Sequence, residues 1–395
     1  MRIASLLIVL FSALTGVSAQ IPITERPLVY QQPGMDKVDI RKNVVYKTDN
    51  DTALVLEVYY PPSFDKKNKL PVVIFNNGVG SLDLLNWRAY TDWAKLIAVN
   101  GLIAINYQSR HGRAYQDTED LIAYVRAHAD DLKIDADRIG LWTCSANVTV
   151  GLPVMMQPDR TYIKCGVVYY GSAQLESMRT DLPILYVRSG LDGAIINTGI
   201  ERTIRHMVEV ECDLTYIQYA EGQHAFDILD DTDRSRQIIR QTIEFFTYNL
   251  TKPDAPVRIL TAKRFQTFIE QGDTARAFTE YRNFVKYIRA AGTYSPFYTW
   301  AINENGLVGM GYQLLQNKKT KEALAVFSVN VESFPVSPNA YDCLSDAYEA
   351  DGQVELAVVN AQRALDLLAA ATNLNDNFKN GIRRSAEDKI KRLKK

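Results

Sequence analysis

Apolar and polar residues follow two different patterns along the chain as far as residue 250. Between Asn43 and Tyr60 they alternate one by one, and the polar stretch 48–51 separates two such halves. Alternation with a period of two is typical of a half-buried β-strand, and a polar break between two strands favours a tight turn. The sequence therefore predicts an antiparallel hairpin over residues 43–60.

Beyond the hairpin, short apolar runs alternate with longer amphipathic stretches. The runs, each with the length of a buried strand, are residues 71–75, 102–106, 139–143, 165–169, 184–188 and 214–219. The stretches with helical spacing are residues 87–99, 118–129, 145–156, 197–208 and 232–248. Strands that alternate with helices indicate a parallel sheet. We therefore predict an α/β fold with a mostly parallel sheet that helices cover on both faces.

The pattern changes near residue 250. Residues 250–256 combine Pro253 and Pro256 with polar residues, and every strand signal stops beyond them. Such a stretch is typical of a domain boundary. We predict an α/β domain over residues 20–252 and an all-α helical domain over residues 257–395.

Two parts of the helical region are related by a fixed offset. Aligning residues 321–327 with residues 355–361 places Ala323 on Ala357. The offset between these two alanines equals the period of tetratricopeptide repeats, so the region resembles a tetratricopeptide-like array. The resemblance implies a surface for a protein partner or for oligomerisation. Residues 261–288 are only repeat-like, because their offset differs from that period.

Residues 1–19 have the pattern of a signal peptide. Arg2 precedes a short apolar run, and the small-residue end Val-Ser-Ala stands before Gln20. The alternative is a membrane anchor, but the run is shorter than the ~20 residues that span a bilayer, and no later segment reaches that length. We expect export to a periplasmic or secreted location, and no membrane span.

Composition and charge narrow the class of partner. The 395 residues are 47% hydrophobic and 23% charged, with a net charge of -1, as in ordinary globular proteins. This balance gives no electrostatic case for binding nucleic acid or an anionic membrane. The cysteines, Cys144, Cys165, Cys212 and Cys343, have irregular spacing. Without metal-ligand spacing or a phosphate-binding glycine motif, we expect no metal and no cofactor.

A serine stands between the third apolar run and the helix expected after it. A strand, a sharp turn with Ser145 at its tip and a helix form the context of a nucleophile elbow. In that turn the backbone N–H of Ala146 points to where an oxyanion would form. The usual motif is Gly-x-Ser-x-Gly, whereas Thr143 and Asn147 replace both glycines here, so neighbouring residues must make room for them. The alternative is that Ser145 only caps the helix.

An aspartate and a histidine follow later strands. Asp192 comes just after run 184–188, and His224 lies in the loop between run 214–219 and the last helix of the domain. The order Ser, Asp, His is that of α/β hydrolases. Asp227 is an alternative acid. Of the other histidines, His128 and His206 fall in helical stretches, and His111 is a secondary candidate in a loop.

The stretch Gly222-Gln-His224-Ala-Phe226, with Asp192 upstream, resembles the dienelactone hydrolase group of α/β hydrolases and its feruloyl esterase and prolyl-oligopeptidase-like relatives. The resemblance covers about residues 38–250. It implies Ser145 as nucleophile, His224 as base and Asp192 as orienting acid. It also implies that Val79 or Gly78 supplies the second oxyanion N–H, although a glycine-rich turn alone explains that segment too. Tyr107 and Arg110 are implied as possible substrate contacts.

These observations together predict an exported serine esterase that acts through an acyl-enzyme. Only residues 170–181 separate two strand runs where related enzymes often insert a helical cap, so we expect an open site. The expected substrate is an ester-bearing small molecule or a polymer-attached ester, and an open site suits a bulky or polymer-attached ester better than a sequestered small one. The altered elbow favours an alternative, a catalytically degenerate hydrolase fold that binds a partner. A peptidase is a further alternative, but such enzymes usually carry an N-terminal propeller, for which residues 20–40 leave no room.

Overall fold

The computed structural model describes residues 21–49, 52–76, 82–253, 259–371 and 374–394. Contacts between residues divide the chain after Pro253 into two compact units, which are described separately below. The predicted signal peptide lies outside the described residues.

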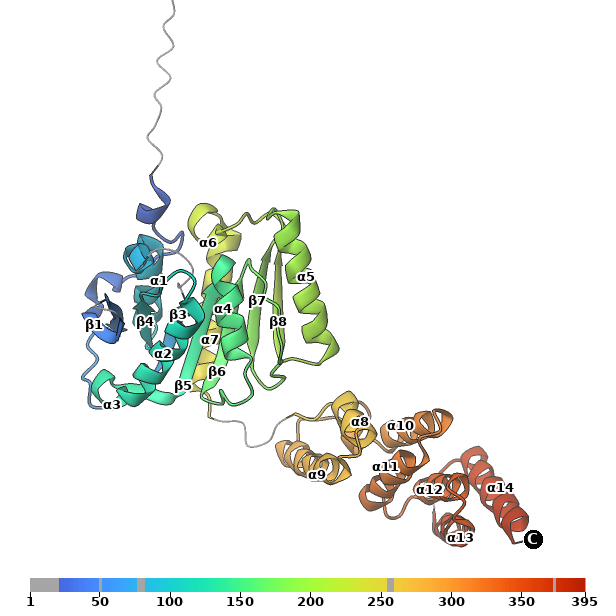
Figure 1. Cartoon of the computed structure of the whole chain (residues 1–395). Coiled ribbons are helices and arrows are strands. Elements are labelled where there is room, and N and C mark those ends of the chain that lie inside the picture. Colours follow the sequence, from blue (N-terminus) through green and yellow to red (C-terminus); the bar gives the residue numbers. More distant parts are fainter. Residues whose placement is uncertain (1–20, 50–51, 77–81, 254–258, 372–373, 395) are drawn as a thin grey trace, which may run out of the picture. The chain divides into compact units, whose positions relative to one another are not determined.

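The first unit contains an eight-stranded sheet (Figure 1). Its strands, in spatial order, are β1 (Asp39–Asp49), β2 (Thr52–Tyr60), β4 (Ile103–Tyr107), β3 (Leu70–Asn76), β5 (Ile134–Cys144), β6 (Ile163–Tyr169), β7 (Ile184–Ser189) and β8 (Leu214–Tyr219). β2 runs antiparallel to both β1 and β4, and every other neighbouring pair is parallel. The hairpin and the mostly parallel sheet are confirmed.

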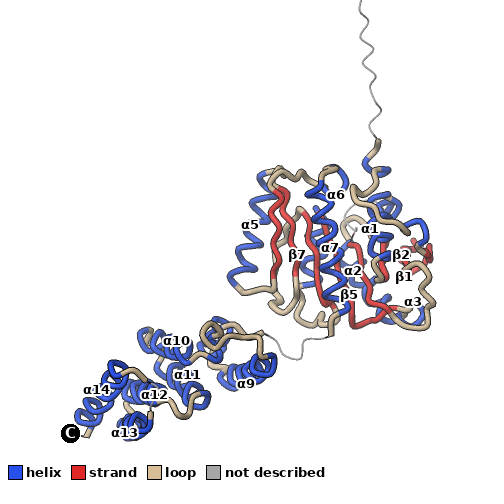
Figure 2. Tube along the Cα trace, turned by 180° about the vertical axis from the view of Figure 1, so that it is seen from behind, coloured by secondary structure: helices blue, strands red, loops and turns tan. Residues whose placement is uncertain are grey.

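Helices cover both faces of this sheet, as a comparison of Figures 1 and 2 shows. One face packs against α1 (Arg88–Val99), α6 (Phe226–Leu229) and α7 (Asp233–Thr251). The other packs against α2 (Ala114–Ala127), α3 (Ala129–Leu132), α4 (Val148–Met155) and α5 (Ala194–Glu209). Because successive strand side chains point to opposite faces, Val73 and Phe75 of β3 join the first core, whereas Val72 and Ile74 join the second. Burial on both sides explains the continuous apolar runs of the sequence, and the predicted α/β-hydrolase fold class is confirmed.

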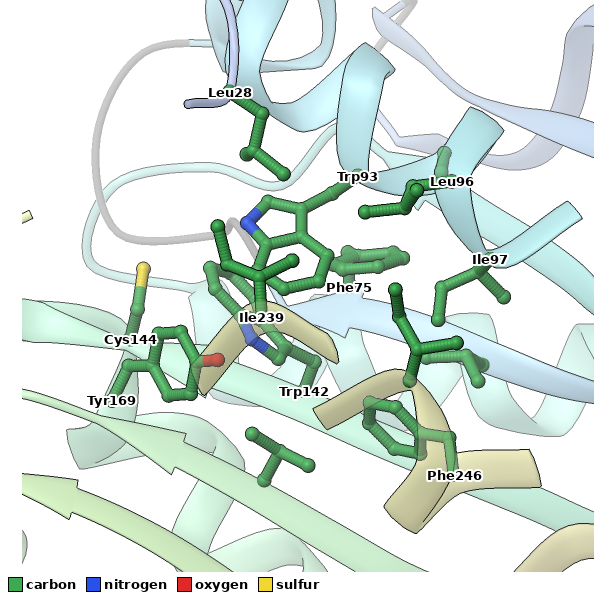
Figure 3. Close-up of a cluster of buried hydrophobic side chains, with 14 of the residues drawn as sticks. Leu28, Phe75, Trp93, Leu96, Ile97, Trp142, Cys144, Tyr169, Ile239 and Phe246 are labelled. Atoms are coloured by element: carbon green, nitrogen blue, oxygen red, sulfur yellow. The ribbon is translucent and has the colours of Figure 1, made fainter. Parts of the chain in front are cut away.

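An aromatic cluster fills the first core beneath the end of β5 (Figure 3). The ring of Trp142 lies 5.3 Å from that of Phe75 and 5.7 Å from those of Trp93 and Tyr169, centroid to centroid. Aromatic pairs at such distances add to the stabilisation that burial of their area provides. They hold the last residues of β5 in place, immediately before Ser145.

Some element bounds differ from the sequence prediction. β5 begins at Ile134 rather than at residue 139, because its backbone pairs with β3 from Leu70 onward although residues 135–138 are mostly polar. The helix expected from residue 145 starts with a 3-10 turn, η4 (Ser145–Asn147), before α4. The helix expected over residues 118–129 begins earlier, at Ala114, and is divided into α2 and α3.

The second unit is helical, as predicted. Its helices are α8 (Ala262–Glu270), α9 (Thr274–Ala291), α10 (Glu304–Gln316), α11 (Thr320–Ser333), α12 (Pro338–Ala350), α13 (Val354–Ala370) and α14 (Asp376–Leu393). The start of α12 follows the start of α10 by the same number of residues as the start of α13 follows that of α11. The same number of residues also separates Ala323 from Ala357. These two alanines occupy equivalent, fully buried positions in α11 and α13. The assignment to tetratricopeptide repeats stays a prediction.

Within the residues that the structure describes, no helix is both long enough and apolar enough to cross a membrane. All four cysteines are free thiols; Cys144, Cys165 and Cys343 are buried, and Cys212 is partly buried.

Candidate active site

Ser145 occupies a strained backbone position at the end of β5. Its φ is +51°, whereas Cys144 before it has the extended conformation of the strand. A residue other than glycine in the left-handed region is uncommon, and such strain gathers at functional sites. The turn therefore has the conformation expected of a nucleophile elbow.

Two glycines elsewhere in the fold make room for this turn. A Cβ added to Gly151 of α4 would lie 2.7 Å from both Cβ and Oγ1 of Thr143, so Thr143 fills the space that Gly151 leaves. A Cβ on Gly171 would overlap the backbone carbonyl of Ser145. Neither glycine was predicted from the sequence to take part in the site. The signal for Gly151 was present, because a glycine inside a helix is less favourable than alanine and calls for a packing reason.

His224 and Asp192 lie beside Ser145. His224 follows β8 and Asp192 follows β7, so adjacent parallel strands bring both residues to the same edge of the sheet. The distance from Ser145 Oγ to His224 Nε2 is 2.7 Å, and that from His224 Nδ1 to Asp192 Oδ2 is 2.6 Å. The three predicted residues thus form one hydrogen-bonded row.

Burial and hydrogen bonding set the character of each group in this row. The side chain of Asp192 is 4% exposed and that of His224 is 38% exposed, so the acid is shielded while the imidazole is accessible. The backbone N–H of Gly193 donates to Asp192 Oδ1 at 2.8 Å, which holds the carboxylate in place. With Nδ1–H donating to Asp192, Nε2 of a neutral imidazole is free to accept the hydroxyl proton of Ser145.

Asp227, the alternative acid, makes other contacts. It is fully buried, its Oδ2 accepts from Trp93 Nε1 at 2.9 Å, and its Oδ1 accepts from the Tyr170 hydroxyl at 2.7 Å. Burial raises the pKa of Asp227. The imidazole Nδ1 therefore meets Asp192, whereas Asp227 binds side chains behind the site.

Tyr170, which was not predicted from the sequence, also contacts the site. Its ring centroid lies 4.8 Å from that of His224, and its φ is +34°. The backbone N–H of Tyr170 donates to Val187 of the neighbouring strand at 2.9 Å. The ring of Tyr170 thus packs beside the imidazole, while its hydroxyl donates to Asp227. Its place at the end of β6 was the available signal.

The predicted oxyanion donors are only partly described. Ala146 lies next to Ser145 in η4, at the start of the helical segment. Val79 and Gly78 lie outside the described residues, so their predicted role stays a prediction.

Tyr107 and Arg110, the expected substrate contacts, are engaged within the domain. Tyr107 is buried, its hydroxyl lies 2.7 Å from Thr118 Oγ1, and it accepts from Asn76 Nδ2 at 3.1 Å. Arg110 donates to Asp117 and to Asp49, both at 2.6 Å. These bonds tie β3, β4, α2 and the end of β1 together. Tyr107 is thus buried and Arg110 is paired with two carboxylates, and their role as substrate contacts stays a prediction.

A groove of about 930 Å³ lies beside α5. It is lined by Thr149 of α4, by residues 172–175 and Met178 of the segment between β6 and β7, and by one side of α5. The segment between β6 and β7 contains no helix, which agrees with the expected lack of a helical cap. No group of three or more His, Cys, Asp or Glu side chains within the described ranges is arranged to hold a metal ion. The expectation that no metal or cofactor is needed stays a prediction.

Comparisons with known proteins give likenesses among solved structures only. No model of a protein family matches the sequence, and no curated protein matches it. Thermogutta terrifontis esterase 2 phosphoramylated by tabun has 17% sequence identity and a TM-score of 0.41, over 56% of this chain and 98% of that one. A bacterial heroin esterase has 13% identity and a TM-score of 0.45, over 55% of this chain and 86% of that one.

A third solved structure, from a study of two fungal esterases of Rhizomucor miehei, has 15% identity and a TM-score of 0.44, over 54% of this chain and 84% of that one. At such low identity and TM-scores the likeness does not extend to activity or substrate.

Proposed function

We propose that this chain is a serine hydrolase that cleaves carboxylic esters through an acyl-enzyme. The observation that carries the proposal is the row Ser145–His224–Asp192, with distances of 2.7 Å and 2.6 Å, at the tip of a strained turn. A hydroxyl that hydrogen-bonds to an imidazole, itself oriented by a buried carboxylate, is the arrangement that activates serine as a nucleophile.

The reaction proceeds in two halves. Ser145 Oγ attacks the ester carbonyl while His224 Nε2 takes its proton, and the resulting oxyanion accepts hydrogen bonds from the N–H of Ala146 and from that of Val79 or Gly78. The tetrahedral intermediate expels the alcohol, which takes the proton from His224. A water molecule then repeats the sequence on the acyl-enzyme and releases the acid, while Asp192 keeps the imidazole in the required tautomer.

Two competing interpretations have less support. If Ser145 served only as a helix cap, its hydroxyl would accept from a backbone N–H of the first turn, but the turns at η4 and α4 have no side-chain cap. A degenerate binding protein is favoured by the missing elbow glycines. Against it, Gly151 leaves the space that Thr143 fills, and Gly171 leaves space for the carbonyl of Ser145.

The remaining parts of the proposal concern the whole protein. The uncapped groove supports a substrate that is either a small ester or an ester attached to a polymer. We propose export on the basis of residues 1–19, and a tetratricopeptide-like role in partner binding or oligomerisation for the helical unit. The equal offset between its helix pairs supports the latter.

Reaction with a fluorophosphonate probe tests the proposal. Wild-type protein should be labelled, Ser145→Ala should not, and Ser328→Ala, which removes an exposed hydroxyl in α11, should be labelled like wild type. Hydrolysis of p-nitrophenyl acetate should fall by a factor on the order of 1000 or more in Ser145→Ala and His224→Ala. An unlabelled wild type, or equal labelling of Ser145→Ala, would exclude the hydrolase and favour the binding protein.

A further inference from the structure

A buried asparagine contacts the loop that carries Asp192. Residues 190–193, which we call the acid loop, connect β7 to α5, the light-green helix beside β7 and β8 in Figure 1. Asn197 of α5 is 6% exposed. Its Nδ2 donates to the backbone carbonyl of Asp192 at 3.1 Å and to that of Gly190 at 3.3 Å. Because carbonyl oxygens only accept hydrogen bonds, the NH2 end of the amide must face the acid loop.

The acid loop is also bonded to the loop that carries His224. The backbone N–H of Leu191 donates to the carbonyl of Gly222 at 2.9 Å. A Cβ added to Gly190 would overlap the backbone carbonyl of Ala220, so the two loops are in direct contact. The acid loop is therefore fixed by the segment before His224 as well as by α5.

The position of the Asp192 carboxylate depends on this backbone. Its Oδ1 accepts from the N–H of Gly193 in the same loop, and its Oδ2 lies 2.6 Å from His224 Nδ1. Misplacing a catalytic group by about 1 Å can cost a factor on the order of 100 in rate. Because Asn197 binds the carbonyl of Asp192 itself, a change at Asn197 reaches the carboxylate through a single residue.

We propose that Asn197 is a positioning residue for the serine hydrolase reaction, whose amide fixes the acid loop so that the Asp192 carboxylate meets His224 Nδ1. This inference rests on the proposed esterase function and adds to it a residue that does not touch the reacting atoms. The residues that line the groove beside α5 include Ala194 and Thr198 but not Asn197. Asn197 should therefore affect the rate of the chemical steps and not the binding of substrate.

Asn197→Leu tests the proposal, because leucine has a similar size and lacks the amide donor. The kcat for p-nitrophenyl acetate should fall by about 10- to 100-fold. KM should stay within about twofold, since acylation and deacylation both use the His224–Asp192 pair and should slow together. The rate of labelling by a fluorophosphonate should fall by a factor similar to that of kcat. An unchanged kcat would overturn the proposal.

Asn249→Leu is the matched control. Asn249 is a buried asparagine of α7 whose Nδ2 donates to the carbonyl of Phe245 at 2.9 Å, and its Oδ1 accepts from Lys252 at 2.8 Å. Both partners lie in α7 or directly after it. The control should leave kcat and KM within about twofold of wild type, because no catalytic group depends on this amide. Equal losses of kcat in the two variants would show that Asn197 has no special part in the reaction.

A double-mutant cycle shows whether Asn197 acts through Asp192. In an Asp192→Ala background the carboxylate is absent, so Asn197→Leu should change kcat by less than about twofold. A loss as large as in the wild-type background would overturn the proposal, because Asn197 would then act by another route.

The tautomer of His224 provides a readout that needs no activity. In protein with isotopically labelled histidine, the NMR shifts of the ring nitrogens distinguish the Nδ1–H tautomer from the Nε2–H tautomer above about pH 8, where a free imidazole is neutral. The signals of His224 are assigned by their loss in His224→Ala. They should report Nδ1–H in wild type, and a mixture of tautomers in both Asn197→Leu and Asp192→Ala.

The tautomer and the kinetics together separate the two levels of the proposal. If wild type hydrolyses no ester while the tautomer depends on Asn197, the esterase function fails and the positioning role stands. If wild type is an active esterase and neither kcat nor the tautomer responds to Asn197→Leu, the positioning role fails and the esterase stands. An inactive wild type whose tautomer does not respond overturns both.

Discussion

Thr143 and Gly151 interlock at the turn that presents Ser145. In the usual elbow a glycine precedes the nucleophile by two residues, because a side chain there would collide with the following helix. Here the side chain is on the strand, and the glycine is on the helix. All three atoms nearest to an added Cβ at Gly151 belong to Thr143. Gly151 of the helix therefore provides the space that a glycine of the strand provides in the usual elbow.

This pairing predicts a change of sign in a double-mutant cycle. Gly151→Ala alone should lower the free energy of unfolding by about 1–3 kcal/mol, because its Cβ overpacks against Thr143. In a Thr143→Gly background the same substitution should raise it by about 0.5–1 kcal/mol, since alanine is the better residue inside a helix. Urea unfolding of the four proteins measures both values. The same sign in both backgrounds would show that the two side chains do not compete for space.

Tyr170 leads to a second prediction at the residue scale. Tyr170→Phe keeps the ring beside His224 but removes the donor to Asp227 Oδ1, which leaves a buried carboxylate oxygen without that bond. We expect a loss of about 1–3 kcal/mol in the free energy of unfolding, measured by urea denaturation. Tyr216→Phe is the control, since that hydroxyl is on an exposed strand position, and it should cost much less. Equal losses would mean that Asp227 does not depend on Tyr170.

The sequence was sufficient for some of these residues and not for others. Ser145, Asp192 and His224 each follow an apolar run, so the order of strands alone placed them at one edge of the sheet. Gly171 and Tyr170 act through contacts with residues far along the chain, such as Ser145 and His224, and no local pattern encodes such contacts. Gly151 contacts Thr143 nearby in the sequence, but its position inside a helix gave only a general signal of close packing. Arg110 was predicted as a possible substrate contact, and its pairing with Asp117 and Asp49 could not be predicted from the sequence, because these partners lie in other elements.

At the scale of elements, a group of charged residues fastens β1 to the start of α2. Asp117 of α2 accepts from Lys47 of β1 at 3.0 Å and from Arg110 of the preceding loop at 2.6 Å. The backbone N–H of Arg110 also donates to Asp117 at 2.9 Å. These bonds fix the loop before α2, and they involve residues that the apolar pattern does not report. Helix starts were accordingly less predictable than strands.

The charged group predicts a loss of stability in acid. Burial opposes ionisation of Asp117, but its hydrogen bonds with Arg110 and Lys47 outweigh this and lower the pKa of Asp117 to about 2. Because the unfolded chain titrates near 3.9, the unfolded state binds more protons between about pH 4 and pH 2. Stability should therefore fall by about 2 kcal/mol as the pH decreases through this window.

Urea unfolding of wild type and of Asp117→Asn between pH 5 and pH 2 measures this contribution. The variant should be less stable at pH 5 and should lose less stability in acid. Asp39→Asn, which removes an exposed carboxylate of β1 that pairs with Lys66, should keep the wild-type dependence. An unchanged slope in Asp117→Asn would show that Asp117 is not the group responsible.

For the whole molecule, the change of pattern near residue 250 separates two units that differ in their cores. The α/β unit buries apolar residues on both faces of its sheet. The helical unit has an apolar core of its own, which includes Phe265, Phe284, Leu307 and Phe327. A stretch with two prolines marked the position between them in the sequence.

Separate cores predict that the proposed chemistry is contained in the α/β unit. A chain ending at Pro253 keeps Ser145, Asp192, His224 and the groove beside α5, as well as both cores of the sheet. Its kcat/KM for p-nitrophenyl acetate should stay within about twofold of the full-length value, since transition-state stabilisation depends on the groups that contact the reacting atoms. The matched fragment from residue 254 onward should show helical circular dichroism and a cooperative thermal transition. If the shorter chain is instead insoluble, or loses activity while remaining folded, the helical unit is required by the hydrolase unit as structure and is not an independent binding array.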